Sequence, residues 1–138
     1  MTKTYSNEME EIINGKHTAF INNGAKVRCI RATVTLSAQA NGDQIVLGHL
    51  PQGASFKFGI LNSSSSLGTA TIEIGTDSDA DKYKASAVFT TVNTPVLFGV
   101  LNTEVIGPGG EDVVLKIGTA ALPASGTLLA DIYYTDNA

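Results

Sequence analysis

The chain has one cysteine, no tryptophan and few charged residues, and each scarcity excludes something. A single cysteine, Cys29, excludes a disulfide within the chain. Because Cys29 lies in an apolar segment with strand-like alternation, we expect it to be a small buried residue and not a nucleophile. Only 16% of residues are charged, against about 25% in typical soluble domains. The nine Lys and Arg residues are scattered through a chain of formal net charge −4, so we expect no nucleic-acid partner.

Long hydrophobic runs are also missing. No run approaches the ~18 apolar residues that a membrane-spanning helix needs. The first residues, MTKTYSNEMEE, lack the apolar core of a signal peptide. We therefore expect no membrane partner, and synthesis in a reducing cytoplasm that the chain leaves, if at all, within a larger assembly.

Catalytic motifs are absent as well. His17 and His49 are the only histidines, and neither G-x-S-x-G nor H-E-x-x-H occurs. The glycine-rich run 107–110 lacks the Lys-Ser/Thr and the following helix that a phosphate-binding loop requires. We expect a protein that is not an enzyme and binds no cofactor.

Alternating carboxylates at Asp77, Asp79 and Asp81 are the sharpest local motif, because hard oxygen ligands suit Ca²⁺. A calcium loop of the EF-hand type also needs Gly at its sixth position and Glu at its twelfth. This chain has Lys82 and Val88 there. We therefore expect a solvated loop between strands and no metal, with these three aspartates as weak candidate ligands.

Alternation of apolar and polar residues is what the sequence does have. Period-two alternation places one side of a strand in a core and the other in water. Eight segments are candidate strands, several of them with this alternation, and turns such as Asn41-Gly42 and Leu50-Pro51-Gln52-Gly53 separate them. The segments are residues 26–37, 44–47, 54–61, 69–74, 84–91, 95–101, 113–118 and 127–134.

These segments predict an all-β fold. No segment long enough for a three-turn helix separates them, so parallel βαβ units are excluded. Eight antiparallel strands favour a single jelly-roll-like β-sandwich over residues 26–138. The alternation predicts that its core contains Phe56, Phe58, Ile60, Ile72, Ile74, Leu115, Ile117 and Ile132.

Residues 1–25 lie outside this pattern and predict an arm with a short helix. Ser6 can cap the helix, Met9, Ile12 and Ile13 share one face, and Asn14-Gly15 ends it. Two turns are too few for a stable isolated helix, so the arm must dock. We expect it to make intermolecular contacts through Tyr5, Met9, Ile12, Ile13 and Phe20, although the domain's own flank is the alternative.

The segment from Asp43 to Gly75 resembles a known family. It contains D-x-I-x-L-G-x-L-P-x-G-A, then a strand, then L-G-x-A-T-I-x-I-G. This order resembles small β-sandwich proteins that are encoded among tailed-phage head genes and decorate or cement the capsid. The matching residues are Asp43, Ile45, Leu47, Gly48, Leu50, Pro51, Gly53, Ala54, Leu67, Gly68, Ala70, Thr71, Ile72, Ile74 and Gly75.

The resemblance implies a structural virion protein. It implies binding to the major capsid protein on the outside of the head, self-association as a homotrimer, and synthesis in the host cytoplasm. Two alternatives stay open. A carbohydrate- or host-surface-binding module of a head fibre or tail would need exposed aromatic rings and carboxylates together on one loop face. A cupin-like enzyme would need His and Glu ligands, which two isolated histidines do not provide.

Overall fold

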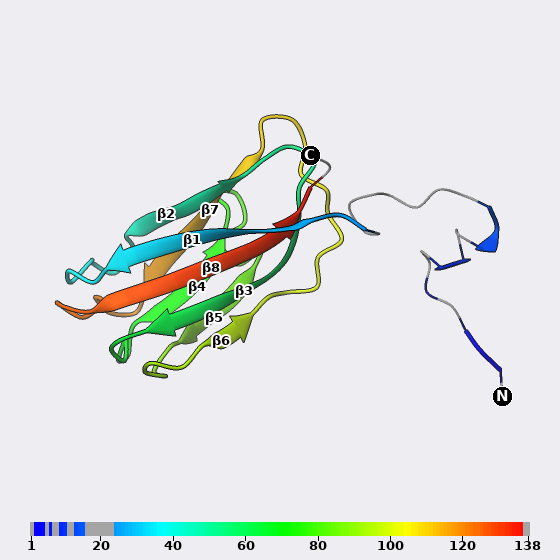
Figure 1. The fold of residues 1–138 in the computed structure, drawn as a ribbon. Helices are drawn as coiled ribbons and strands as arrows, with labels where there is room; N and C mark the ends of the chain where they lie inside the picture. Colours follow the sequence, from blue (N-terminus) through cyan, green and yellow to red (C-terminus); the bar gives the residue numbers. More distant parts are fainter. Residues whose placement is uncertain (1, 5, 7–8, 11–12, 16–23, 137–138) are drawn as a thin grey trace.

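The computed structural model describes residues 2–4, 6, 9–10, 13–15 and 24–136. Within these residues the chain forms eight antiparallel strands in two stacked sheets (Figure 1). The strands are β1 (Val27–Thr35), β2 (Gln44–Leu50), β3 (Ser55–Ser63), β4 (Thr71–Gly75), β5 (Lys84–Val88), β6 (Val96–Phe98), β7 (Glu111–Gly118) and β8 (Thr127–Thr135). The expected all-β sandwich is confirmed.

The connectivity is that of a jelly roll. One sheet, called sheet A here, has the strand order β1-β8-β3-β6, and the other, sheet B, has the order β2-β7-β4-β5. Every pairing between neighbouring strands of the two sheets is antiparallel. Successive strands mostly alternate between the sheets, which is how eight strands close a two-layer jelly roll.

The core lies between the inner faces of the two sheets. Sheet B contributes Ile72, Ile74, Leu115 and Ile117, all fully buried, and β8 of sheet A contributes Ile132. These five burial predictions are confirmed. Phe56 is 2% exposed and packs against the buried ring of Tyr83, with ring centroids 4.3 Å apart.

Two core predictions are wrong, because a β-bulge interrupts β3. Phe56 pairs with Tyr134 and Phe58 pairs with Tyr133, so Lys57 is an extra residue in the β3–β8 ladder. An extra residue reverses the side of the sheet to which all following side chains point. Phe58 and Ile60 are therefore only half-buried, and Gly59 and Leu61 face the core in their place.

A close packing contact explains the small residue at Gly59. A Cβ atom there would overlap the ring of Phe98 from the neighbouring strand β6. The ring of Phe98 thus occupies the core space that a side chain at position 59 would otherwise fill.

The ends of several strands differ from the expected ranges. β6 covers only Val96–Phe98, so most of the expected strand 95–101 is irregular chain. β5 ends at Val88, three residues short of its expected end. β2 continues past its expected end to Leu50, because a register shift between Val46 and Gly48 returns Leu50 to the core.

The described residues of the arm agree with a capped short helix. Met9, Glu10 and Ile13 are helical, and the Met9 amide donates a hydrogen bond to Ser6 Oγ at 3.3 Å. Gly15 has φ +75°, a left-handed value that suits glycine at the end of a helix. Tyr5, Ile12 and Phe20 lie outside the described residues. None of the helical residues described forms a segment both long and apolar enough to cross a membrane.

Candidate functional site

The outer face of sheet A is the strongest candidate for a functional surface. The bulge at Lys57 places Phe58 on this face, where its ring stacks on Tyr133 with centroids 4.6 Å apart and planes 15° apart. Ile60 lies beside Asp131 of β8 on one side and beside Leu97 of β6 on the other. Apolar and aromatic side chains of three strands, Phe58 and Ile60 of β3, Leu97 of β6 and Tyr133 of β8, thus lie on this outward face.

An ion pair joins the edge strand β1 to β8 on this face. Arg31 Nε and Nη2 donate hydrogen bonds to the two carboxylate oxygens of Asp131, both at 2.8 Å. The hydrogen bond from Arg31 holds the pKa of the Asp131 carboxyl below its usual range, although burial acts in the opposite direction. The two charges of the pair compensate each other, which leaves this part of the face suitable for contact with another protein surface.

Cys29 belongs to the same outward face, so the prediction that it is buried is wrong. Its side chain is exposed, and its register partner on β8 is Tyr133. Ile30 and Val34, on the opposite side of β1, contribute to the core. The alternation in β1 places Cys29 on the same side as Arg31 and Thr33, but the prediction followed the apolar character of its neighbours instead.

A groove continues the face beyond the short edge strand β6. Its volume is about 420 Å³, and its lining includes Phe58, Leu97, Val100 and Leu101. Leu101 is 95% exposed, Leu97 68% and Val100 44%. Four of the ten large hydrophobic side chains that are exposed in the described residues lie between positions 97 and 105. Such a concentration of exposed apolar side chains is typical of interaction sites.

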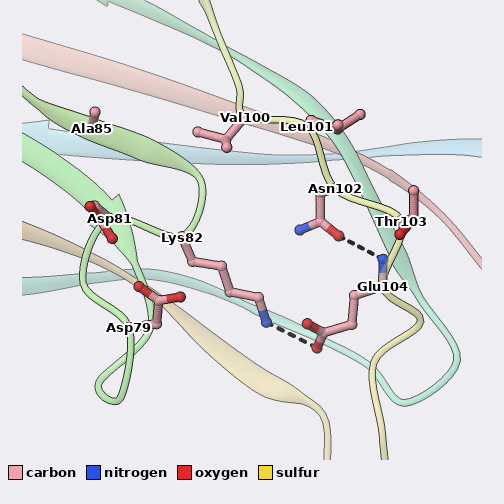
Figure 2. A pocket seen from close by; sticks show the side chains of 9 residues that line it. All are labelled: Asp79, Asp81, Lys82, Ala85, Val100, Leu101, Asn102, Thr103 and Glu104. Atoms are coloured by element: carbon pink, nitrogen blue, oxygen red, sulfur yellow. Dashed lines mark hydrogen bonds and ion pairs between the residues drawn. The ribbon is translucent and has the colours of Figure 1, made fainter.

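The chain after β6 is held in place at Ile106 and at Glu104. Ile106 is 5% exposed, its amide donates to the Ala54 carbonyl at 2.9 Å, and its carbonyl accepts from the Gly53 amide at 2.8 Å. Glu104 accepts a hydrogen bond from Lys82 Nζ at 3.0 Å, and its own amide donates to Asn102 Oδ1 at 2.8 Å (Figure 2). These contacts fix the segment that carries Val100 and Leu101.

Lys82 connects that segment to the core. Its ammonium group also donates to both carboxylate oxygens of Glu111 at 3.0 Å, and the hydroxyl of buried Tyr83 donates to the same carboxylate. Burial acts to lower the pKa of Lys82, but the hydrogen bonds to Glu104 and Glu111 outweigh it and raise the pKa. Burial and the Glu111 contact raise the pKa of Tyr83. Lys82 therefore stays protonated and links Glu104 of this segment to Glu111 of β7.

A second cleft lies between this segment and the acidic loop that contains Asp77, Asp79 and Asp81. Asp79 and Asp81 line a shallow cleft of about 570 Å³ together with Lys82, Asn102 and Glu104, and Asp77 is not part of the lining (Figure 2). A hydrogen bond with Asp81 raises the pKa of Asp79. Among the residues that the structure describes, no group of three or more His, Cys, Asp or Glu side chains is arranged to hold a metal ion.

The histidine that the structure describes, His49, pairs with Asp112. His49 Nδ1 lies 2.8 Å from Asp112 Oδ1, and both side chains are about half exposed on the outer face of sheet B. Cys29 lies on the opposite face of the sandwich, so it cannot act with this pair as a nucleophile. His17 lies outside the described residues.

The predicted interface residues of the arm are exposed where the structure describes them. Met9 is 44% and Ile13 56% exposed. The sequence did not predict the groove, because it assigned residues 95–101 to a regular strand. A usable signal was present in the consecutive apolar residues Val100 and Leu101, which do not alternate with polar ones.

Comparisons with known proteins identify the fold. No protein-family model matches the chain, and no curated protein matches it. Among solved structures, a chain of the cyanophage Pam1 capsid asymmetric unit superposes with a TM-score of 0.67 and 16% identity, covering 80% of this chain and 85% of that one. A chain of the Ralstonia phage GP4 capsid superposes with a TM-score of 0.61 and 20% identity, covering 82% and 86%.

A third structure agrees with these two. A chain of the acid-stable capsid of the Helicobacter pylori bacteriophage KHP30 superposes with a TM-score of 0.57 and 14% identity, covering 78% of this chain and 86% of that one. At such low identity the likeness extends to the fold and not to the residues of any site. The chain therefore shares its sandwich with chains found in three phage capsid structures.

Proposed function

We propose that the protein is a structural component of a phage virion that binds the outer surface of the capsid and holds neighbouring capsomers together. The observation that carries the proposal is the outward apolar face of sheet A, on a fold shared with chains of three phage capsid structures. The major capsid protein is the proposed partner, and the protein acts on the outside of the head after synthesis in the host cytoplasm.

The physical reason for cementing is linkage. A protein that binds the assembled shell, and not its separated subunits, stabilises the shell by mass action. Contact with several capsomers at once adds avidity. A homotrimer would supply such repeated contacts around a three-fold position. Low charge and a self-neutralising Arg31–Asp131 pair suit close packing on a protein surface.

The carbohydrate- or host-surface-binding alternative has less support. It would place exposed aromatic rings and carboxylates on one loop face. Here Phe58 and Tyr133 stack on the sheet face, whereas Asp79 and Asp81 line the cleft beside the β6–β7 connection. No aromatic side chain is among the described residues that line that cleft.

The direct test uses shells of the phage that encodes the chain, prepared without this protein. We expect the purified protein to sediment with these shells and to raise the temperature at which they release their DNA. Tyr133→Ala should weaken the binding at least tenfold, because it removes half of the stacked pair on the outer face. Val46→Ala, on the outer face of sheet B where Val46 is 61% exposed, is the matched control and should bind normally. Wild-type protein that neither sediments with shells nor stabilises them would overturn the proposal.

A further inference from the structure

The groove beside β6 has the form of a preformed binding site. Its exposed wall consists of Leu97, Val100 and Leu101, and Phe58 lies in its lining. The hydrogen bonds of Glu104 and Ile106 fix the position of the segment that carries Val100 and Leu101. A groove that exists before binding loses little conformational entropy when it is filled.

The same chain carries a segment that fits such a groove. Met9 and Ile13 are four residues apart on one helical face, and both are exposed. A helix of this length needs an external surface to be stable in water. Apolar grooves commonly bind short amphipathic helices through side chains at this spacing. Three glutamates within residues 8–11 make the segment acidic, and Lys57 at the groove is of the opposite charge.

The length of the intervening chain permits contact with another molecule. Fourteen residue steps separate Ile13 from Val27, and an extended chain covers ~3.3–3.6 Å per residue, so the arm reaches up to about 50 Å. Sheet A is only about 15 Å wide between its edge strands, since neighbouring strands lie ~4.8 Å apart. The arm is thus long enough to pass beyond its own domain.

The single chain leaves both surfaces exposed. The arm could reach its own groove, yet Met9 and Ile13 are exposed and so are Leu97 and Leu101. Both surfaces are therefore available for contact with another molecule. A second copy of the chain is the partner that is present wherever the protein is present.

We propose that the groove formed by Phe58, Leu97, Val100 and Leu101 binds the amphipathic segment 6–14 of a second copy of this chain. This inference rests on the self-association part of the proposed function and names the two surfaces that meet. A contact between two different surfaces repeats from copy to copy and closes into a ring when the rotation permits. A closed ring of three copies gives the homotrimer, with each arm in the groove of its neighbour.

Disulfide trapping tests the contact without any capsid. Cys29→Ser removes the one native thiol, and Ile13→Cys and Leu101→Cys are then made in separate chains that carry tags of different mass. We expect mild oxidation of the mixture to give the mixed covalent dimer. Ile13→Cys mixed with Val46→Cys, whose new thiol would lie on the outer face of sheet B, is the control and should give at least tenfold less mixed dimer.

A chain with both Ile13→Cys and Leu101→Cys distinguishes the two possible sources of the arm. We expect it to give covalently linked dimers and trimers. Oxidation that yields only internally linked monomers, at micromolar concentration, would mean that the arm fills its own groove and would overturn the proposal.

Sedimentation of charged variants provides the second measurement. Leu101→Asp and a chain beginning at Gly24 should each weaken self-association at least tenfold while keeping a β-type circular dichroism spectrum. Val46→Asp should associate like the wild type. Unchanged association of both groove and arm variants would contradict the proposal. Wild-type binding to shells remains a separate measurement, so failure of capsid binding and failure of arm exchange can be told apart.

Discussion

Phe56 and Phe58 are two residues apart on β3 and have opposite environments. Phe56 is 2% exposed and lies between the rings of Tyr83 and Phe98, with centroids at 4.3 Å and 6.3 Å. Phe58 is half-buried and contacts Tyr133 on the outer face. The first side chain contributes to stability, and the second is available for contact with a partner.

Alanine substitutions should separate these two roles. Phe56→Ala removes a buried ring and should lower the free energy of unfolding by about 3–5 kcal/mol. Phe58→Ala leaves no cavity in the core and should cost about 1 kcal/mol, mainly through loss of the stacked pair. Urea denaturation of both variants checks this. Equal losses would mean that the bulge at Lys57 does not reverse the side chains.

The Arg31–Asp131 pair gives a pH prediction. The folded-state pKa of Asp131 lies below the value of about 3.9 in an unfolded chain. The pair therefore stabilises the fold above that value, and this stability is lost as the pH falls through the folded-state pKa. Asp131→Asn should melt at a lower temperature than the wild type at pH 7. The difference should close below about pH 4, and a difference that is constant from pH 7 to pH 2 would count against an ionic contribution.

At the scale of elements, the acidic loop between β4 and β5 is closed by its own hydrogen bonds. The Thr76 amide donates to the Asp79 carbonyl at 2.9 Å, and the Asp79 amide donates to Thr76 Oγ1 at 3.1 Å. The Lys82 ammonium lies in the same cleft. A cation would have to compete with this charge for Asp79 and Asp81.

We therefore expect that chelators do not change the stability of the protein. EDTA should leave the melting temperature unchanged within about 1 °C, and added Ca²⁺ should not raise it, since the other ligands of a calcium loop are missing. Differential scanning calorimetry with and without EDTA is the measurement. If EDTA lowers the melting temperature and Ca²⁺ restores it, Asp77, Asp79 and Asp81 form a metal site.

The sequence predicted the positions of the strands more accurately than it predicted which side of each strand faces the solvent. Strand-like segments and the turn residues between them predicted all eight strands, and Ile72, Leu115 and Ile132 lie in the core as expected. The bulge in β3 was invisible, because Phe56-Lys57-Phe58 alternates whether or not residue 57 is an extra one. The groove was equally hidden, since its shape depends on contacts of Glu104 and Ile106 with residues 22 or more positions away.

At the scale of the whole molecule, the sheets join distant parts of the chain. β1 pairs with β8, and β3 also pairs with β8, so sheet A cannot form before its last strand is present. Pairings between residues so far apart in sequence are closed late and at a large entropy cost.

Refolding should accordingly be slow for a domain of this size. We expect time constants of roughly milliseconds to seconds, as for other proteins dominated by non-local β pairing. Stopped-flow tyrosine fluorescence can follow the reaction, because the chain has four tyrosines and no tryptophan to mask them. Complete refolding within microseconds would be incompatible with β8 as the strand that closes sheet A.

The pairing of β1 with β8 also determines how the domain bears tension. Val27 lies beside Thr135, so the two strands meet at their outer ends (Figure 1). A pull that separates these two residues loads the ladder one hydrogen bond at a time, and the sheet opens like a zipper. A pull between Val27 and the loop after Thr35 acts on the two ends of β1 itself, so the already extended backbone of that strand carries the tension and the β1–β8 hydrogen bonds are not loaded. If residues 1–25 are anchored, a fused protein that must resist a pull against them is therefore better inserted in the loop of residues 36–43 than attached after Thr135.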